Sequence, residues 1–169
     1  MKKLANEFME KILNDSAWKV LSENFEWTEQ MLDKHKNQVD WKLISKNYNI
    51  VWTPAILEKF KKLIDWKELS STGCETILTG DTLEQYKDYW DWSELSENIG
   101  LKMSYQLIDR FIDQWDWSEL INRWHEDLYN IDFLERYADK IPSGKLQDSR
   151  LWTTLVEQRE KELKLEVIA

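Results

Sequence analysis

Apolar positions in this chain recur in short groups with a long, regular period. Trp18, Trp41, Trp66, Trp92 and Trp117 are separated by 23, 25, 26 and 25 residues. A Leu or Ile follows each of them three positions later, and Asp precedes four of the five. A fixed period of this size is typical of repeat proteins, in which each repeat is one supersecondary unit that packs on its neighbours.

A second group of apolar positions lies between successive tryptophans. It begins fourteen residues before the next Trp and continues with a Thr or Ser in four of five cases, then an apolar pair, a ring and a bulky apolar residue. Spacings of four, eight and twelve residues keep these side chains on one face of a helix. The ring position is filled in turn by His35, Phe60, Tyr86, Phe111 and Tyr137.

Each repeat therefore predicts two helices. The first is short, with Asp as its N-cap and Trp at its first position, and it ends at an Asn in the left-handed conformation (Asn24, Asn47, Asn98). The second starts at the Thr or Ser cap and runs for about three turns. The predicted fold is all-α, an α-solenoid of about five two-helix repeats of ~25 residues with N- and C-terminal capping helices.

We expect one helical-repeat domain over residues 1–169. It consists of an N-terminal cap helix over residues 1–14, repeats over 15–142 and a C-terminal cap helix over 143–169, because the periodicity stops after Pro142.

The strings YWDWSELSENIGLKMSYQLIDRF and IDWKELSS resemble the short tryptophan-rich DW-x-x-L-S-x-N repeats of many bacterial and viral proteins, phage proteins among them. The resemblance covers about residues 15–142. It implies an α-helical repeat protein that is intracellular or phage-associated, and it implies little about activity. Residues 71–80 and 121–124 depart from the pattern.

The tryptophan content of the chain, eleven residues, is explained mainly by the repeats. Trp at helix-locked positions is expected in the core, where it buries a large apolar surface, rather than on a stacking platform for sugars or bases. Trp124 and Trp152 lie outside the periodic positions and are the better candidates for exposed aromatic contacts.

The net charge of −9 is concentrated in one segment. Residues 81–139 carry 15 acidic and 5 basic side chains, whereas residues 1–80 carry 12 of each. Within this segment the second helices present acids one turn apart, which we call the acidic stripe: Glu84, Asp88, Asp109, Asp113, Glu135 and Asp139. The stripe is either a solvated face or a surface that binds a basic protein partner.

Candidate catalytic residues are few. Cys74 is the single cysteine, and His35 and His125 are the only histidines. A lone cysteine with two unconnected histidines gives little support to a thiol enzyme or a zinc site. We therefore expect no enzyme activity, no cofactor and no metal. An enzyme that uses Cys74 and His125 is retained as a minor hypothesis.

The expected function is that of a non-enzymatic protein–protein interaction module. One specific form of this hypothesis is a phage-type inhibitor that occludes a nucleic-acid-binding defence effector, as anti-CRISPR proteins do. The alternative is a scaffold or self-assembling repeat module with no inhibitory role. Direct nucleic-acid binding is disfavoured because a basic stripe is lacking.

A cytoplasmic, predominantly monomeric protein is expected. The longest uncharged stretch, Asn47–Leu57, is shorter than the ~20 residues of a membrane-spanning helix. The N-terminal sequence mixes charges and lacks the apolar core of a signal peptide.

Overall fold

The computed structural model describes residues 2–124 and 126–168, and all regular secondary structure in these residues is α-helical. The expected all-α class is confirmed. The chain divides into two compact units, Met1–Trp90 and Asp91–Ala169.

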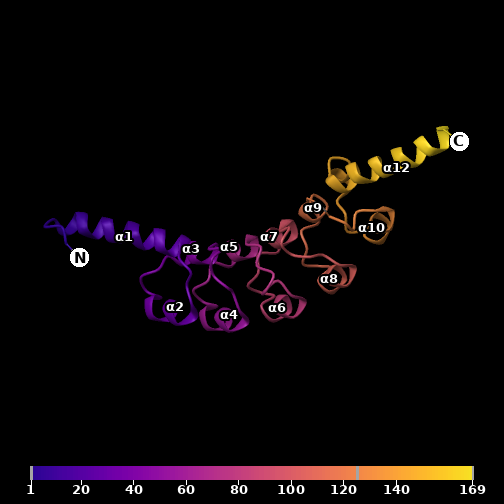
Figure 1. Cartoon of the computed structure of the whole chain (residues 1–169). Coiled ribbons are helices and arrows are strands. Elements are labelled where there is room, and N and C mark those ends of the chain that lie inside the picture. The colour runs from indigo at the N-terminus through magenta and orange to yellow at the C-terminus, as the bar shows by residue number, and fades with distance from the viewer. Residues whose placement is uncertain (1, 125, 169) are drawn as a thin grey trace. The chain divides into compact units, whose positions relative to one another are not determined.

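The first unit contains six helices: α1 (Glu7–Asn24), α2 (Glu29–His35), α3 (Trp41–Ser45), α4 (Pro54–Phe60), α5 (Trp66–Ser71) and α6 (Gly80–Gln85). Helix α3 packs against both α1 and α5. Ion pairs join α2 to α4, and a hydrogen bond from Tyr86, the C-cap of α6, joins that helix to α4. Within this unit α1, α3 and α5 therefore form one row and α2, α4 and α6 a second row (Figure 1).

The described part of the second unit contains six further helices: α7 (Trp92–Glu97), α8 (Tyr105–Arg110), α9 (Trp117–Leu120), α10 (Ile131–Arg136), α11 (Ser143–Leu146) and α12 (Arg150–Ile168). Helix α7 packs against α9, and ion pairs join α8 to the α10 segment. The predicted cap helix over 143–169 is thus two helices, since the chain turns between α11 and α12 at residues 147–149.

The short first helices begin where the sequence predicts. Helices α3, α5, α7 and α9 each start at a Trp, and the Asp before it caps the helix by accepting hydrogen bonds from backbone N–H groups of the first turn. These bonds satisfy donors that have no partner within the helix.

The serine that follows the aliphatic position links one repeat to the next. The buried Ser45 hydroxyl donates to the Trp41 carbonyl oxygen (2.6 Å) and accepts from the Asp65 backbone N–H (2.9 Å). Ser22 and Ser96 make the same two bonds, with Asp40 and Asp116 as the respective N–H donors. Each of these serines therefore fixes the residue that caps the first helix of the following repeat.

The predicted left-handed Asn at the end of the first helix is wrong at Asn98, whose φ of −65° and ψ of 107° are extended. The buried Asn47 shows what this position does instead. Its amide donates to the carbonyl oxygens of Ser22 and Phe25 in the preceding repeat, both at 2.9 Å. The position thus joins repeats through its side chain rather than ending a helix through its backbone.

Arg123 holds the irregular end of the last repeat. Its side chain is 4% exposed, and its guanidinium donates to the carbonyl oxygens of Ser96 (3.1 Å), Asn98 (2.8 Å) and Leu101 (2.7 Å). Its Nε donates to the Glu126 carboxylate at 2.9 Å. The departure from the repeat pattern at residues 121–124 therefore replaces an Asn-type link with a longer, charged one.

The N-terminal cap helix and the first helix of the first repeat are one continuous helix. Residues 1–14 were expected to form a separate cap helix, but α1 runs from Glu7 to Asn24. Ala17 stands before Trp18 where the other repeats have Asp, so no N-capping side chain is available to begin a new helix there.

The second helices are shorter than the predicted three turns. Helices α2, α4, α6, α8 and α10 have six or seven residues each. The remaining turn is separate, and in four of the five repeats the carbonyl oxygen of the ring residue accepts from the N–H groups three and four residues later, as Phe60 does from Leu63 and Ile64.

The periodic tryptophans pack against the ring column, although four of the five are half-buried and Trp117 alone is buried, so they lie at the edge of the expected core. The ring centroids are 5.1 Å apart for Trp41–Phe60, Trp92–Phe111 and Trp117–Tyr137. In the first repeat His35 takes the ring position, half-buried, with its centroid 5.4 Å from that of Trp18. These contacts join the two helices of each repeat.

Helix α12 is anchored at its beginning alone. Leu151 and Leu155 are buried, and the Leu151 N–H donates to the Ile121 carbonyl oxygen at 3.0 Å. Gln158 Nε2 donates to the Tyr129 carbonyl oxygen (3.0 Å), the last contact that α12 makes with another part of its unit among the described residues. Residues 159–168 are exposed, and in Figure 1 this part of α12 extends away from α10.

Candidate functional site

The acidic stripe lies on the row of second helices. Glu84 belongs to α6, Asp109 to α8 and Glu135 to α10, and each is followed four residues later by the other acid of its repeat, in the turn after the helix. All six side chains are exposed. Glu84 and Asp88 belong to the first unit, and the other four to the second.

Asp109 is an internal contact of the second unit. Its carboxylate accepts from the Arg136 guanidinium and from the Tyr137 hydroxyl, the latter at 2.9 Å. The hydrogen bond from Arg136 is the main cause that holds the pKa of Asp109 below its ordinary value. Burial, and then the hydrogen bond to Asp109, raises the pKa of Tyr137 to about 12. Asp109 therefore stays ionised and joins α8 to the end of α10.

Asp113 is also paired within the second unit. Its carboxylate lies 2.8 Å from Lys140 Nζ, which raises the pKa of that lysine. The negative charge of Asp109 and Asp113 is therefore balanced by cations from the next repeat. Sequence reasoning placed both acids on one exposed face but missed these partners.

Acids on the second helices of the first unit are also held by side chains of the next repeat. Lys59 lies 3.0 Å from Glu29 and 3.3 Å from Asp33, and the Tyr86 hydroxyl donates to the Glu58 carboxylate at 3.0 Å. An acid on one second helix is thus held by a cation or hydroxyl 26 to 30 residues later. The signal in the sequence is this offset, slightly longer than the repeat, between an acid and a Lys, Arg or Tyr.

Three members of the acidic stripe have no ion-pair or hydrogen-bond partner among the described residues. They are Asp88 at the end of the first unit and Glu135 and Asp139 in the last repeat. Asp139 lies near enough to Lys140 to contribute to the raised pKa of that lysine, but none of the three carboxylates forms an ion pair or hydrogen bond, so they are the stripe residues best placed to meet an external cation.

A second acidic group lies on the row of first helices in the second unit, and the sequence analysis missed it. Glu97 of α7 lies beside Glu94 and Glu119. Desolvation of the Glu97 carboxylate, followed by the negative charges of Glu119 and Glu94, raises its pKa. In the first unit Lys42, directly after Trp41, lies 3.2 Å from Glu68, whereas the second unit has Ser93 and Ser118 at this position. The available signal was the change of the residue after the Trp from Lys, as in WKLI (41–44) and WKEL (66–69), to Ser, as in WSEL (92–95 and 117–120).

The two candidate aromatic contacts differ in exposure. Trp124 is 59% exposed, and the Arg150 guanidinium lies over its ring. Trp152 is half-buried at the start of α12. Trp124 is therefore the more accessible of the two rings.

Of the residues considered for catalysis, the structure describes Cys74 and His35, and these two make separate contacts. Cys74 is half-buried between α5 and α6, with Sγ 3.0 Å from the Thr76 hydroxyl. His35 packs on Trp18 and lies 2.6 Å from Gln38 Oε1 through Nδ1. His125 lies outside the described residues. Over residues 2–124 and 126–168, His, Cys, Asp and Glu side chains form no group suited to hold a metal ion.

No protein-family model, curated protein or solved structure matches the chain. Among the helices described, none combines the length and apolar character that crossing a bilayer requires.

Proposed function

We propose that this protein is a non-enzymatic interaction module of the α-solenoid type whose acidic surface binds a basic protein partner. The observation that carries the proposal is the placement of exposed carboxylates with no internal partner, such as Glu135 and Asp139, in the segment that holds the whole charge excess. Repelling charges lower the stability of a fold, and the charge-balanced first 80 residues form the same helix pairs without them.

The acidic residues proposed for binding are taken unit by unit: Asp88 in the first unit, and Glu135, Asp139 and the group Glu94, Glu97 and Glu119 in the second. Like charges held close together produce a negative potential that steers a basic partner and weakens with salt. Asp109 and Asp113 contribute less to it, because Arg136 and Lys140 neutralise them.

The partner class follows from the chemistry of the surface. A field of carboxylates complements Lys- and Arg-rich surfaces, and these are the surfaces that bind nucleic acid. The small size, the acidity and the resemblance to phage-associated repeats support a specific form of the proposal, an inhibitor that occludes a nucleic-acid-binding defence effector in the manner of anti-CRISPR proteins.

The test is a comparison of captured proteins at low and high salt. Asp88→Lys, Glu135→Lys and Asp139→Lys are combined in one variant, since none of these acids supports a contact within the fold. We expect the triple variant to lose salt-sensitive partners that the wild type captures, with an unchanged circular dichroism spectrum.

A matched control reverses three exposed acids outside residues 81–139, namely Asp15, Glu26 and Glu75. This control makes the same change in net charge and is expected to retain the partners. Equal loss in both variants would show that overall charge, rather than this surface, governs capture, and would refute the proposal.

A self-assembling module is the second candidate function. It is favoured by a different observation, the exposed apolar face of α12, which is independent of the acidic surface.

A further inference from the structure

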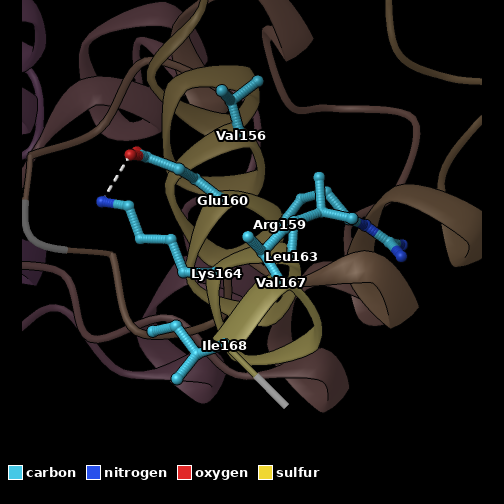
Figure 2. A pocket seen from close by; sticks show the side chains of 7 residues that line it. All are labelled: Val156, Arg159, Glu160, Leu163, Lys164, Val167 and Ile168. Carbon is cyan, nitrogen blue, oxygen red and sulfur yellow. Dashed lines mark ion pairs between the residues drawn. The ribbon is translucent and has the colours of Figure 1, made fainter.

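The exposed half of α12 carries a stripe of apolar side chains, interrupted by Glu160, that no other element covers. Val156, Leu163 and Val167 are 51%, 49% and 85% exposed and line an open apolar hollow along the helix. Their spacing of seven and four residues keeps them on one side of the helix. Figure 2 shows these side chains with the charged residues that border them.

This stripe is distinct from the face that anchors α12 to its own unit. Leu151, Leu155 and Gln158 make the internal contacts, and at 100° per residue they lie about 80° or more around the helix from Val156 and Leu163. The stripe therefore remains open while α12 is packed in place.

The charges on either side of the stripe form a self-complementary pattern. One border carries Arg159 and Glu166, and the other carries Glu157 and Lys164. In each border a positive and a negative residue are separated by seven positions. The midpoint of each pair lies near the middle of residues 156–167.

We propose that residues 156–167 of α12 pair in an antiparallel arrangement with the same segment of a second copy of the chain. A two-fold axis between the two helices places each border of one copy beside the same border of the second copy, with the chain running in the opposite direction. Arg159 then faces Glu166 of the second copy, and Glu157 faces Lys164 of the second copy. Val156 packs near Val167 of the second copy, and the two Leu163 residues lie near the centre of the interface.

A parallel pair is disfavoured by the same charges. Flanking positions five residues apart approach each other in a parallel two-helix arrangement. This would place Arg159 beside Lys164 of the second copy, twice per dimer. Flanking charges set the orientation of helix pairs, so the sequence selects the antiparallel one.

The exchange releases Arg159 from Glu162 outside the stripe, whereas Glu160, which lies within the stripe, loses Lys164 and thereby weakens the dimer. Arg159 lies 3.3 Å from Glu162, and Lys164 lies 2.6 Å from Glu160, with all four side chains about 60% exposed. Such exposed pairs contribute little to stability. Since the paired segment is about 18 Å long, the interface is small, and we expect a weak, concentration-dependent dimer.

The test is analytical ultracentrifugation of the full chain from about 5 to about 500 µM. We expect the weight-average mass to rise toward that of a dimer and no further. Leu163→Glu is expected to abolish the rise, because it removes the central apolar side chain and adds a second carboxylate beside Glu160. The matched control is Leu165→Glu, which lies on the opposite side of the helix at 72% exposure and is expected to leave the rise unchanged.

Charge exchange tests the orientation. Arg159→Glu is expected to weaken the dimer at least tenfold by placing like charges opposite each other, and the double variant Arg159→Glu/Glu166→Arg is expected to restore it. A constant monomer mass would overturn the proposal. So would growth beyond a dimer that is abolished by Phe8→Glu in α1 rather than by Leu163→Glu, because that result would show end-to-end assembly. Failure of the double variant to restore the dimer would overturn the antiparallel arrangement.

Discussion

The Ser45 hydroxyl accepts a hydrogen bond from the backbone N–H of Asp65 at 2.9 Å, so one serine positions the residue that caps the next short helix. Ser45 is fully buried and also donates to Trp41. We expect Ser45→Ala to lower the free energy of unfolding by about 1–3 kcal/mol, because it leaves the Asp65 N–H without its partner at the junction between repeats.

Urea-induced unfolding followed by circular dichroism measures this effect. The control is Ser16→Ala, an exposed serine in the middle of α1, which is expected to change stability by less than about 0.5 kcal/mol. Equal effects of the two substitutions would contradict a linking role for Ser45.

Arg123 is expected to be the most sensitive charged residue of the second unit. Arg123→Ala removes hydrogen bonds to three carbonyl oxygens and leaves the nearly buried Glu126 carboxylate unpaired. The expected cost is about 3–5 kcal/mol, the usual range when one member of a buried ion pair is removed.

Arg123→Lys is expected to recover little of this loss, because an ammonium group cannot reproduce the planar fork of donors. Lys161→Ala, at an exposed position of α12, is the control for loss of one positive charge. Wild-type stability of Arg123→Ala in urea would rule out this anchoring role.

Trp27 and Trp52 occupy equivalent positions but differ in their hydrogen bonds. Trp27 Nε1 donates to the Leu21 carbonyl oxygen at 2.9 Å, whereas Trp52 Nε1 is buried with no partner. Both Trp→Phe substitutions lose packing, yet only Trp27→Phe loses a hydrogen bond. We therefore expect Trp52→Phe to cost about 1–2 kcal/mol less than Trp27→Phe, as measured by parallel denaturation curves. A larger cost for Trp52→Phe would argue against this account.

Glu97 makes the stability of the folded chain depend on pH, and the direction of this dependence follows from its raised pKa. Its pKa is raised above the ordinary value of 4.5 in the folded chain, so between these two values the folded state binds more protons than the unfolded state. Stability therefore falls as pH rises through this window. We expect Glu97→Gln to stabilise the protein at pH 7 by about 0.5 kcal/mol, a small value because the side chain is exposed.

The gain from Glu97→Gln should shrink as pH falls below the raised pKa, because the wild-type carboxyl is then neutral as well. Thermal unfolding at pH 7 and at about pH 4 tests both statements. Glu26→Gln, which neutralises an exposed acid in the first unit, is the control. A Glu97→Gln protein less stable than the wild type at pH 7 would show that the group is not repulsive.

The local elements could be predicted from the sequence because their signals lie within one repeat. Asp40 and Trp41 mark a helix start through capping chemistry, and the pairing of Trp41 with Phe60 follows from apolar spacing. The links between repeats could not be predicted in the same way. The partners of Asn47, Asp109 and Arg123 lie 22 to 28 residues away, and they become visible only when neighbouring helices are in place.

Contacts between repeats also decide which acids of the acidic stripe are free to bind a partner. Charge counting found the segment and the exposed column, but it could not distinguish Asp109, which is held by Arg136, from Glu135, which has no such partner. The unbroken α1 is a different case, since the absence of Asp before Trp18 was visible in the sequence.

The serine-to-aspartate link also bears on how the length of this protein can change. The Ser22 hydroxyl accepts from the Asp40 N–H as the Ser45 hydroxyl accepts from the Asp65 N–H. Removal of residues 40–64 would join Val39 to Asp65, and the Ser22 hydroxyl could then accept from the Asp65 N–H in the same way. In-frame loss or duplication of such a segment replaces this serine-to-aspartate bond with an equivalent one. A gene built in this way can gain or lose whole helix pairs by recombination while this bond is kept at each surviving junction.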